Sequence, residues 1–256
     1  MNTPIKKCIS LLAAAVALVS TPALAGGEYY GGQQQQPTWI VGYSGVDIAK
    51  DSHYFYTGAL VALNRDLSKS GFVLQAFSGY GSYEYANPSV PGGRVDGDGV
   101  QLSAMLGYMF VGQAATLALY AGVDHQNYDL TPNDPSNRVS GSETGVRIGG
   151  DLRTTGNYHY ASLEGYYSTA FESYWARARV GAKVDRFTFG PEGVMLGSEG
   201  YDARRLGGFV MTKLNLSPNV SSELTFNAGY QFVDQGQFSS NGGEGAYGGM
   251  NLSFSF

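Results

Sequence analysis

Three histidines, His53, His125 and His159, are the side chains of this sequence that could act as general bases. A hydrolase needs such a base within hydrogen-bond reach of a nucleophile. His159 and Ser162 differ in parity along one extended segment, so they point to opposite faces of a strand. His125 has Asn127 two residues on but no serine at the same level, and His53 has no evident partner. The pattern therefore predicts a protein without a catalytic site.

Two aspartates alternate with glycines at Asp96-Gly97-Asp98-Gly99. A calcium loop starts with closely spaced carboxylates, but it also needs further oxygen ligands and a late glutamate, which this sequence lacks. The glycine clusters lack the strand–loop–helix setting of phosphate-binding loops. We interpret the segment as a solvated turn and expect neither a metal nor a cofactor.

Charged side chains that share one parity form the largest set of polar candidates. Val146 and Ile148 alternate with Arg147, and Val180 follows Arg179 in the same way. Because successive side chains of a strand point to opposite faces, the charges gather on one face. They are either an ion-paired filling or a lining that a glycan or small solute could contact. The set comprises Arg147, Asp151, Arg153, Glu164, Arg177, Arg179, Lys183, Arg205, Lys213 and Glu223, with Glu192 as a further candidate.

The aromatic residues fall into two groups. Tyr120, Tyr160 and Tyr166 share the parity of the charges, where they could stack on sugar rings or simply fill space. The others lie near the ends of the expected strands, which is typical of the aromatic girdles of membrane barrels. This second group comprises Tyr43, Tyr54, Phe55, Tyr56, Tyr108, Phe110, Tyr128, Tyr174 and Trp175.

Strands must position these side chains. The chain has 37 glycines, which disfavour helices, and 19 tyrosines, which favour strands. After residue 25 no stretch has a sustained helical period. Twelve strand-like runs follow, at 38–48, 53–64, 72–85, 98–110, 115–128, 142–153, 158–168, 174–185, 187–196, 202–216, 222–234 and 245–256. The third run alternates poorly, so a count that differs by two stays open.

Alternation alone also fits a soluble β-sandwich. If both chain ends are periplasmic, the outer connections at 86–97, 129–141 and 235–244 are long and most inner turns are tight, as in outer-membrane barrels. An Arg or Lys that faces lipid at the bilayer midplane costs about 2–4 kcal/mol, so the charged face must line the lumen. Lipid offers backbone groups no partners, so the sheet must close. We predict an all-β, antiparallel up-and-down transmembrane β-barrel of about 12 strands.

The first residues predict export. Lys6 and Lys7 precede an apolar run at Ile9–Val19, and Ala23-Leu24-Ala25 supplies a small-x-small cleavage pattern. The apolar run is shorter than the ~20 residues of a spanning helix. We expect a signal peptide at 1–25 that is cleaved after Ala25, a flexible periplasmic leader at 26–37 and a barrel domain at 38–256.

Charge and cysteine content narrow the possible partners. Loss of Lys6 and Lys7 would leave 14 basic against 21 acidic residues, a net charge of −7. Nothing resembles the basic patch of a nucleic-acid-binding protein, so we expect no nucleic-acid partner. Cys8, the one cysteine, precedes the expected cleavage site, so the exported part would contain no disulfide.

The chain end carries a further signal. Met250, Leu252, Phe254 and Phe256 alternate with polar or small residues, and the chain stops on an aromatic. This resembles the C-terminal strand signature of outer-membrane barrels. We therefore expect an outer-membrane location, with membrane lipid as one partner and the barrel-assembly machinery, through the strand ending at Phe256, as another.

Several longer stretches resemble the cellulose biosynthesis protein BcsS family. They are GALVALNRDLSKSGFVLQAF (58–77), VDGDG (95–99), YAGVDHQNYDLTPNDPSNRVSGSETG (120–145), YASLEGYYSTAFESYWARARVG (160–181), FGPEGVMLGSEGYDARRLGGFV (189–210) and GYQFVDQG (229–236). The resemblance implies an accessory protein of bacterial cellulose production, associated with exopolysaccharide and biofilm formation. Cellulose and other cellulose-synthesis proteins are the partners that it implies.

Three functional hypotheses follow. The favoured one is a non-catalytic outer-membrane accessory of cellulose production or export. A small-solute porin and an outer-membrane lipid or glycan hydrolase are the alternatives. The porin hypothesis predicts ion conductance in planar bilayers, and the hydrolase hypothesis predicts loss of activity on substitution of His125 or His159.

Overall fold

The computed structural model describes residues 37–154, 156–217, 220–236 and 243–256. The expected signal peptide and nearly all of the expected leader lie outside the described residues. Within the described residues, no helix has the length and apolar character needed to cross a membrane.

Twelve strands make up the described part of the chain. They are β1 (Ile40–Ala49), β2 (Ser52–Ala62), β3 (Gly71–Ala86), β4 (Arg94–Val111), β5 (Ala115–Thr131), β6 (Gly141–Thr154), β7 (His159–Ser168), β8 (Tyr174–Val184), β9 (Phe187–Ser198), β10 (Tyr201–Ser217), β11 (Val220–Gly236) and β12 (Gly245–Ser255). A single 3₁₀ turn, η1 (Ala170–Glu172), joins β7 to β8. The expected number of strands is therefore confirmed.

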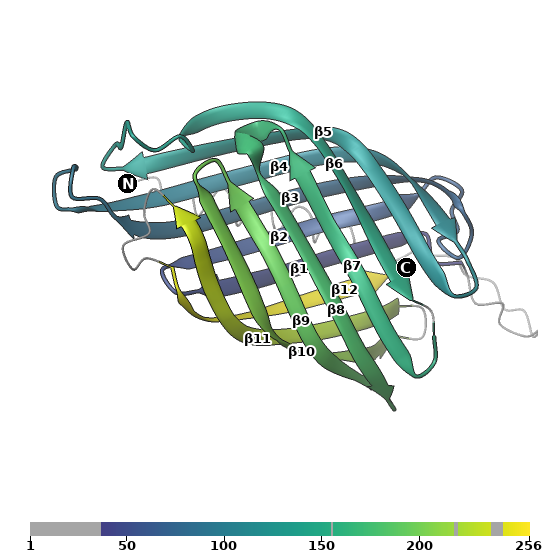
Figure 1. Cartoon of the computed structure of the whole chain (residues 1–256). Helices are drawn as coiled ribbons and strands as arrows, with labels where there is room; N and C mark the ends of the chain where they lie inside the picture. The colour runs from purple at the N-terminus through teal and green to yellow at the C-terminus, as the bar shows by residue number, and fades with distance from the viewer. Residues whose placement is uncertain (1–36, 155, 218–219, 237–242) are drawn as a thin grey trace, which may run out of the picture.

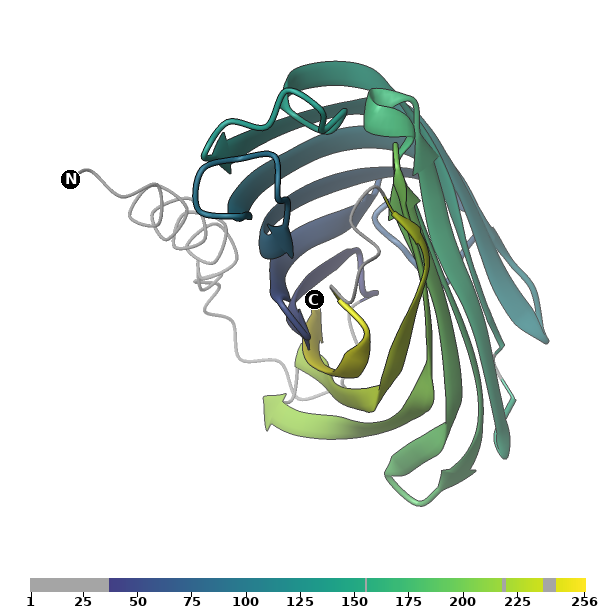
Figure 2. The same cartoon turned by 60° about the vertical axis from the view of Figure 1, so that its left-hand side comes forward.

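The sheet closes on itself in an up-and-down order. Each strand pairs antiparallel with the next, and β1 pairs with β12 to complete the barrel (Figures 1 and 2). The Trp39 amide donates to the carbonyl of Phe256 at 2.6 Å, which joins the two ends of the described barrel. Closure leaves no unpaired sheet edge, as the sequence predicted.

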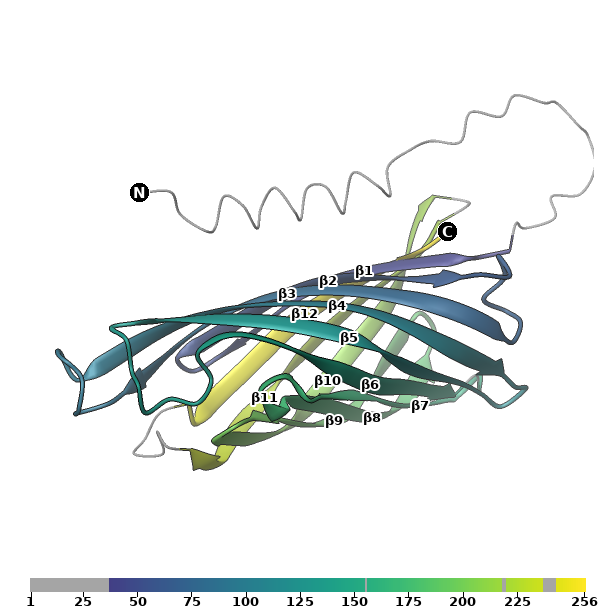
Figure 3. The same ribbon diagram turned by 90° about the horizontal axis from the view of Figure 1, so that it is seen from above.

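The two ends of the barrel differ. The end that holds Trp39 and Phe256, which we call the terminal end, also carries the turn at 112–114. The opposite end, which we call the loop end, carries the connections at 87–93 and 132–140. Figure 3 shows the connection at 87–93 reaching out beyond the ends of the neighbouring strands. The connection at 63–70 is the longest turn of the terminal end.

Alternation sends apolar side chains outward and charges inward. On β10, Leu206 is 63% exposed while its neighbour Arg205 is 8% exposed. Val146, Ile148 and Val180 are likewise exposed on the outer surface. An apolar surface around a closed sheet indicates contact with lipid, because water would not stabilise it.

Some strand boundaries differ from the expected ones at the loop end. The fourth strand begins at Arg94, so the Asp96-Gly97-Asp98-Gly99 segment lies in a strand and not in a turn. Asp98 accepts a hydrogen bond from the Tyr80 hydroxyl at 2.6 Å across the β3–β4 pair. The sequence missed this extension because alternating glycines are typical of turns as well as of strands that neighbour large side chains.

Candidate functional site

One cavity of about 780 Å³ occupies the barrel interior. Lys50 and Ser52 line it at the loop end, and Ser221 and Ser255 line it at the terminal end. The lining therefore extends along the barrel from one end to the other. It is the candidate site because the charged and aromatic side chains that face inward converge on it.

Ion pairs form one side of the cavity, which we call the arginine wall: Arg147, Arg177, Arg179 and Arg205 with the acidic and amide partners that hold them. Arg177 bonds Glu164 at 2.7 Å, and Arg179 bonds Glu192 at 2.5 Å. Arg147 reaches Asp124 at 3.3 Å, and the Arg205 Nε donates to Gln231 at 2.7 Å. Two of these contacts follow the register, since Glu164 lies opposite Arg177 and Glu192 opposite Arg179.

Each of these arginines also lies against an aromatic ring. The Arg147 guanidinium lies 3.5 Å from the centre of the Tyr166 ring, and that of Arg177 lies 4.9 Å from Trp175. Arg179 contacts Phe209 and Arg205 contacts Tyr247 in the same way. A carboxylate or amide on one side and a ring face on the other hold each planar cation in one orientation.

The remaining charges expected in the lumen lie closer to the terminal end. Arg153 lies 3.7 Å from Glu223, and both line the cavity together with Asp151 and Lys213. Lys183 differs from the expectation. Its ammonium group donates to the carbonyl of Gly156 in the β6–β7 turn, and it is not among the residues that line the cavity. Its position at the end of β8 places the side chain against the turn.

Two of the three aromatic candidates, Tyr120 and Tyr166, line the cavity, and Tyr160 does not. Tyr166 lines the cavity beneath Arg147. Tyr120 also lines it but is almost wholly buried, and its hydroxyl donates to Asp151 at 2.9 Å. Tyr160 is buried against Phe209 and is not among the lining residues. Tyr160 therefore fills space, and Tyr166 is the most accessible of the three.

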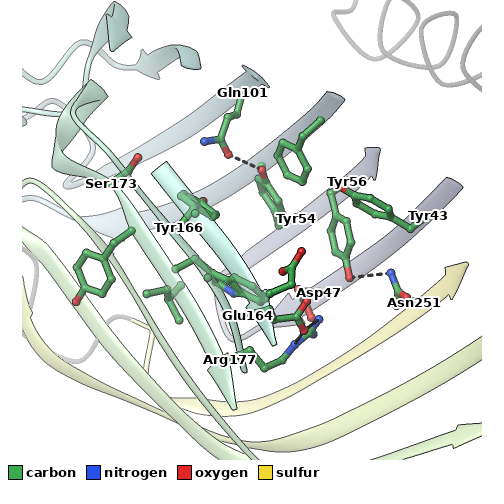
Figure 4. Close-up of a pocket in the computed structure, with 18 of the residues that line it drawn as sticks. Tyr43, Asp47, Tyr54, Tyr56, Gln101, Glu164, Tyr166, Ser173, Arg177 and Asn251 are labelled. Atoms are coloured by element: carbon green, nitrogen blue, oxygen red, sulfur yellow. Dashed lines mark hydrogen bonds and ion pairs between the residues drawn. The ribbon is translucent and has the colours of Figure 1, made fainter. Parts of the chain in front are cut away.

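Tyrosines of the first two strands form a second side of the cavity, which we call the tyrosine wall: Tyr43, Tyr54 and Tyr56. The sequence placed them in a lipid-facing girdle, and that prediction is wrong because all three line the cavity. Tyr128, Tyr174 and Trp175 of the same predicted girdle also line the cavity. Figure 4 shows Tyr43, Tyr54 and Tyr56 across the pocket from Glu164 and Arg177.

Each ring of the tyrosine wall crosses a neighbouring strand. The Tyr56 ring extends over Gly45 of β1, and its hydroxyl accepts from Asn251 of β12 at 3.3 Å. The Tyr43 ring extends over Gly58 of β2 towards Gln75 of β3. These rings lie along the wall because a glycine leaves room for them.

Tyr54 follows the same pattern on the other side of β2. Its ring extends over Gly79 of β3, and its hydroxyl donates to Gln101 of β4 at 3.0 Å. Tyr43 shares the parity of Asp47 on β1, but β2 contains no Asp, Glu, Lys or Arg that would mark the inward face for Tyr54 and Tyr56. All three were assigned to a girdle because they lie near the ends of the expected strands.

Two of the three histidines lie outside the cavity, whereas His53 is among the residues that line it at the loop end. His125 lies on the outer surface, where its Nδ1 pairs with the Thr144 hydroxyl at 2.8 Å. His159 is exposed at the start of β7, whereas Ser162 lines the cavity. No group of three or more His, Cys, Asp or Glu suited to holding a metal occurs in the described ranges.

The family of cellulose biosynthesis protein BcsS has a model that matches residues 41–256 of this sequence. The chain belongs to this family. The match spans all twelve strands, so the closed barrel and both of its walls lie within the region that defines this BcsS-family protein. The resemblance found in the sequence is thereby confirmed. A search of curated proteins finds no match.

Solved structures share the general shape at low identity. The transport unit of the autotransporter AIDA-I from Escherichia coli matches with 12% identity and a TM-score of 0.48, covering 95% of this chain and 97% of that one. The translocator domain of the autotransporter NalP from Neisseria meningitidis has 8% identity and a TM-score of 0.46, with 98% and 95% covered. The KdgM porin in complex with disordered oligogalacturonate has 12% identity and a TM-score of 0.44, with 84% and 99% covered. Likenesses this weak say nothing about function.

Proposed function

We propose that this BcsS-family barrel is a non-catalytic accessory of bacterial cellulose production that acts from the outer membrane. Family membership supplies the process. The single observation that carries the role is the cavity, which extends between the barrel ends and is lined by side chains that hold one another in place. Such a lumen suits passage or holding of a polysaccharide segment during its secretion or anchoring.

The membrane placement rests on the outer surface. Val146, Ile148, Val180 and Leu206 are exposed to the outside of a closed barrel, as in proteins solvated by lipid. The expected signal peptide would direct the chain across the inner membrane. We expect the protein in the outer-membrane fraction, with faster gel migration before boiling than after. Recovery from the soluble periplasm would contradict this placement.

The cellulose role is tested in a deletion strain. We expect less cellulose, or cellulose in the wrong place, as measured by dye binding and by glucose released with cellulase. Permeability to small antibiotics should stay normal, because the role concerns the polymer. Complementation with the wild-type chain is the control, and unchanged cellulose in the deletion strain would refute the role.

The porin hypothesis stays open because the cavity is lined at both ends. A porin would raise ion conductance in planar bilayers, and its loss would lower solute uptake while cellulose stays normal. The accessory hypothesis predicts that loss of the protein lowers cellulose in cells while solute uptake stays normal.

The hydrolase hypothesis is tested by His125→Ala and His159→Ala, two histidines on the barrel exterior. We expect both variants to insert and to restore cellulose fully in the deletion strain. Failure of either folded variant to restore cellulose would revive the enzyme hypothesis.

A further inference from the structure

The tyrosine wall presents ring faces to the cavity. Because Tyr43, Tyr54 and Tyr56 each extend across a neighbouring strand over a glycine, their rings lie along the wall and do not project across the lumen. Hydrogen bonds to side chains two strands away hold two of the rings there. The Tyr56 hydroxyl accepts from Asn251 at 3.3 Å, and the Tyr54 hydroxyl donates to Gln101 at 3.0 Å. A ring that is already held in one orientation loses little conformational entropy when a ligand binds to its face.

Neighbouring rings of this surface have similar orientations. Tyr54 and Tyr56 have centres 6.2 Å apart and planes inclined by 27°. Tyr56 and Phe77 of β3 have centres 6.4 Å apart and planes inclined by 21°. Tyr54 and Tyr56 are thus adjacent rings of similar orientation, and Phe77 extends the aromatic surface to a ring over which the Arg147 guanidinium lies at 4.9 Å. Adjacent rings of this kind suit an extended ligand with repeated flat apolar faces.

The charges that line the cavity are balanced. Among the described lining residues there are seven Lys or Arg and seven Asp or Glu. Several of the arginines are already paired with carboxylates, as Arg177 is with Glu164 and Arg179 with Glu192. A lumen with equal and paired charges has little net attraction for a charged solute. The lining therefore favours an uncharged ligand over an anionic one.

Asp47 provides an acceptor beside the ring faces. Its carboxylate lines the cavity and makes no hydrogen bond or ion pair with another side chain of the described ranges. Figure 4 shows it between Tyr56 and the Glu164–Arg177 pair. A carboxylate beside these rings is positioned to accept hydrogen bonds from hydroxyl groups of a ligand that rests on them.

We infer that the tyrosine wall is a binding surface for a linear, uncharged glycan, which stacks its sugar faces on Tyr54 and Tyr56 and donates hydroxyl hydrogen bonds to Asp47. This inference rests on the proposed function and specifies the part of the lumen that acts. A sugar ring with equatorial hydroxyls has apolar C–H faces and a polar edge, which matches ring faces flanked by a carboxylate.

The test is calorimetric titration of the purified full-length protein in detergent micelles with cellohexaose. We expect saturable binding by the wild type and roughly tenfold weaker binding after Tyr54→Ala with Tyr56→Ala, because stacking on each ring is lost. Tyr56→Phe, which keeps the ring face, should bind as the wild type does. Tyr230→Ala is the matched control, since Tyr230 is exposed on the outer surface. Gel migration before and after boiling establishes that each variant is folded.

Several outcomes would overturn the inference. They are no binding of cellohexaose by the wild type, equal binding by the folded double variant, or tighter binding of oligogalacturonate, an anionic glycan. If the double variant does not fold, Tyr56→Leu carries the same test, because it removes a ring face but keeps an apolar side chain. The titration in micelles is independent of the measurement of cellulose in cells. Binding of cellohexaose together with an unchanged amount of cellulose in the deletion strain would therefore refute the proposed function but not the inference. Cellulose loss without binding refutes the inference alone.

Discussion

The two walls of the cavity hold large polar side chains inside a barrel by different means. The arginine wall uses opposite charges in cross-strand register, as between Glu164 and Arg177. The tyrosine wall uses differences in size, as where Tyr56 lies directly opposite Gly45 and covers it. One wall is fixed by electrostatics and the other by shape and neutral hydrogen bonds.

This difference implies different vulnerabilities. Removing one member of a buried ion pair leaves an uncompensated charge and costs about 3–5 kcal/mol. Removing a neutral hydrogen bond costs about 0.5–1.5 kcal/mol. The arginine wall should therefore be sensitive to loss of single charges. The tyrosine wall should tolerate loss of hydroxyls and be sensitive to added volume.

The largest effect is expected for Arg179→Met. It leaves Glu192, whose side chain is fully buried, without its cation and should destabilise the barrel by about 3–5 kcal/mol. Unfolding by urea in detergent micelles measures the loss. The double variant Arg179→Met with Glu192→Gln removes both charges and should recover most of the stability. Equal stability of wild type and single variant would show that the pair is not a structural element.

A smaller effect is expected for Gly45→Ala. A Cβ at this position would lie 2.5 Å from the Tyr56 ring and 2.8 Å from the carbonyl oxygen of Met250, so the ring or the backbone must move. We expect a loss of about 1–3 kcal/mol in the same unfolding assay. Gly42→Ala is the control, since a Cβ there meets nothing within 4 Å. Equal losses in both variants would contradict packing of the ring over Gly45.

The hydroxyls of the tyrosine wall should matter less. Tyr54→Phe removes the hydrogen bond to Gln101 but leaves the ring over Gly79, so the expected loss is about 0.5–1.5 kcal/mol. Urea unfolding of the variant beside the wild type measures it. A loss as large as that of Arg179→Met would show that the two walls do not differ in the way described.

At the loop end the Tyr85 hydroxyl donates a hydrogen bond to the Asp134 carboxylate at 2.8 Å. Burial alone raises the pKa of Asp134, but hydrogen bonds from Ser136, Tyr85 and Asn87 outweigh it and lower the pKa to about 2. The hydrogen bonds to the ionised Asp134 therefore stabilise the folded loop above the ordinary aspartate pKa, and this stabilisation is lost as the pH falls towards 2. We expect hydrogen exchange in the loop at 132–140 to show no opening from pH 8 to 5.

The same loop should open in acid, below about pH 3. Asp134→Asn should open it at neutral pH and remove this acid dependence, which hydrogen exchange of the variant measures. Asp129→Asn is the control, because Asp129 lies outside this hydrogen-bonded group. An acid transition that persists in Asp134→Asn would assign it to another group.

Much of the fold follows from local pattern. Period-two alternation around Arg147 and Arg179 identified both the strands and the face that carries charge, because a strand has only two faces. Long runs such as β4, expected at 98–110 and found at Arg94–Val111, were located to within a few residues. The inward charges were found since apolar and charged residues alternate cleanly there.

The tyrosine wall was missed because aromatic residues carry no such signal. Tyr54 and Tyr56 suit a lipid interface and a lumen equally well by composition. Neither parity of β2 contains an Asp, Glu, Lys or Arg that marks the inward face, and the neighbouring glycines provide the room for the rings to lie inside without blocking the cavity.

By itself, the sequence of this BcsS-family chain determined the strands, their two faces and the family to which it belongs. Tertiary structure alone decided which side chains meet. Alternation specifies a face but not a register, and register is set by closure of the whole sheet. That closure places Gly45 opposite Tyr56 and Glu164 opposite Arg177, and so creates two unlike walls from one alternating pattern.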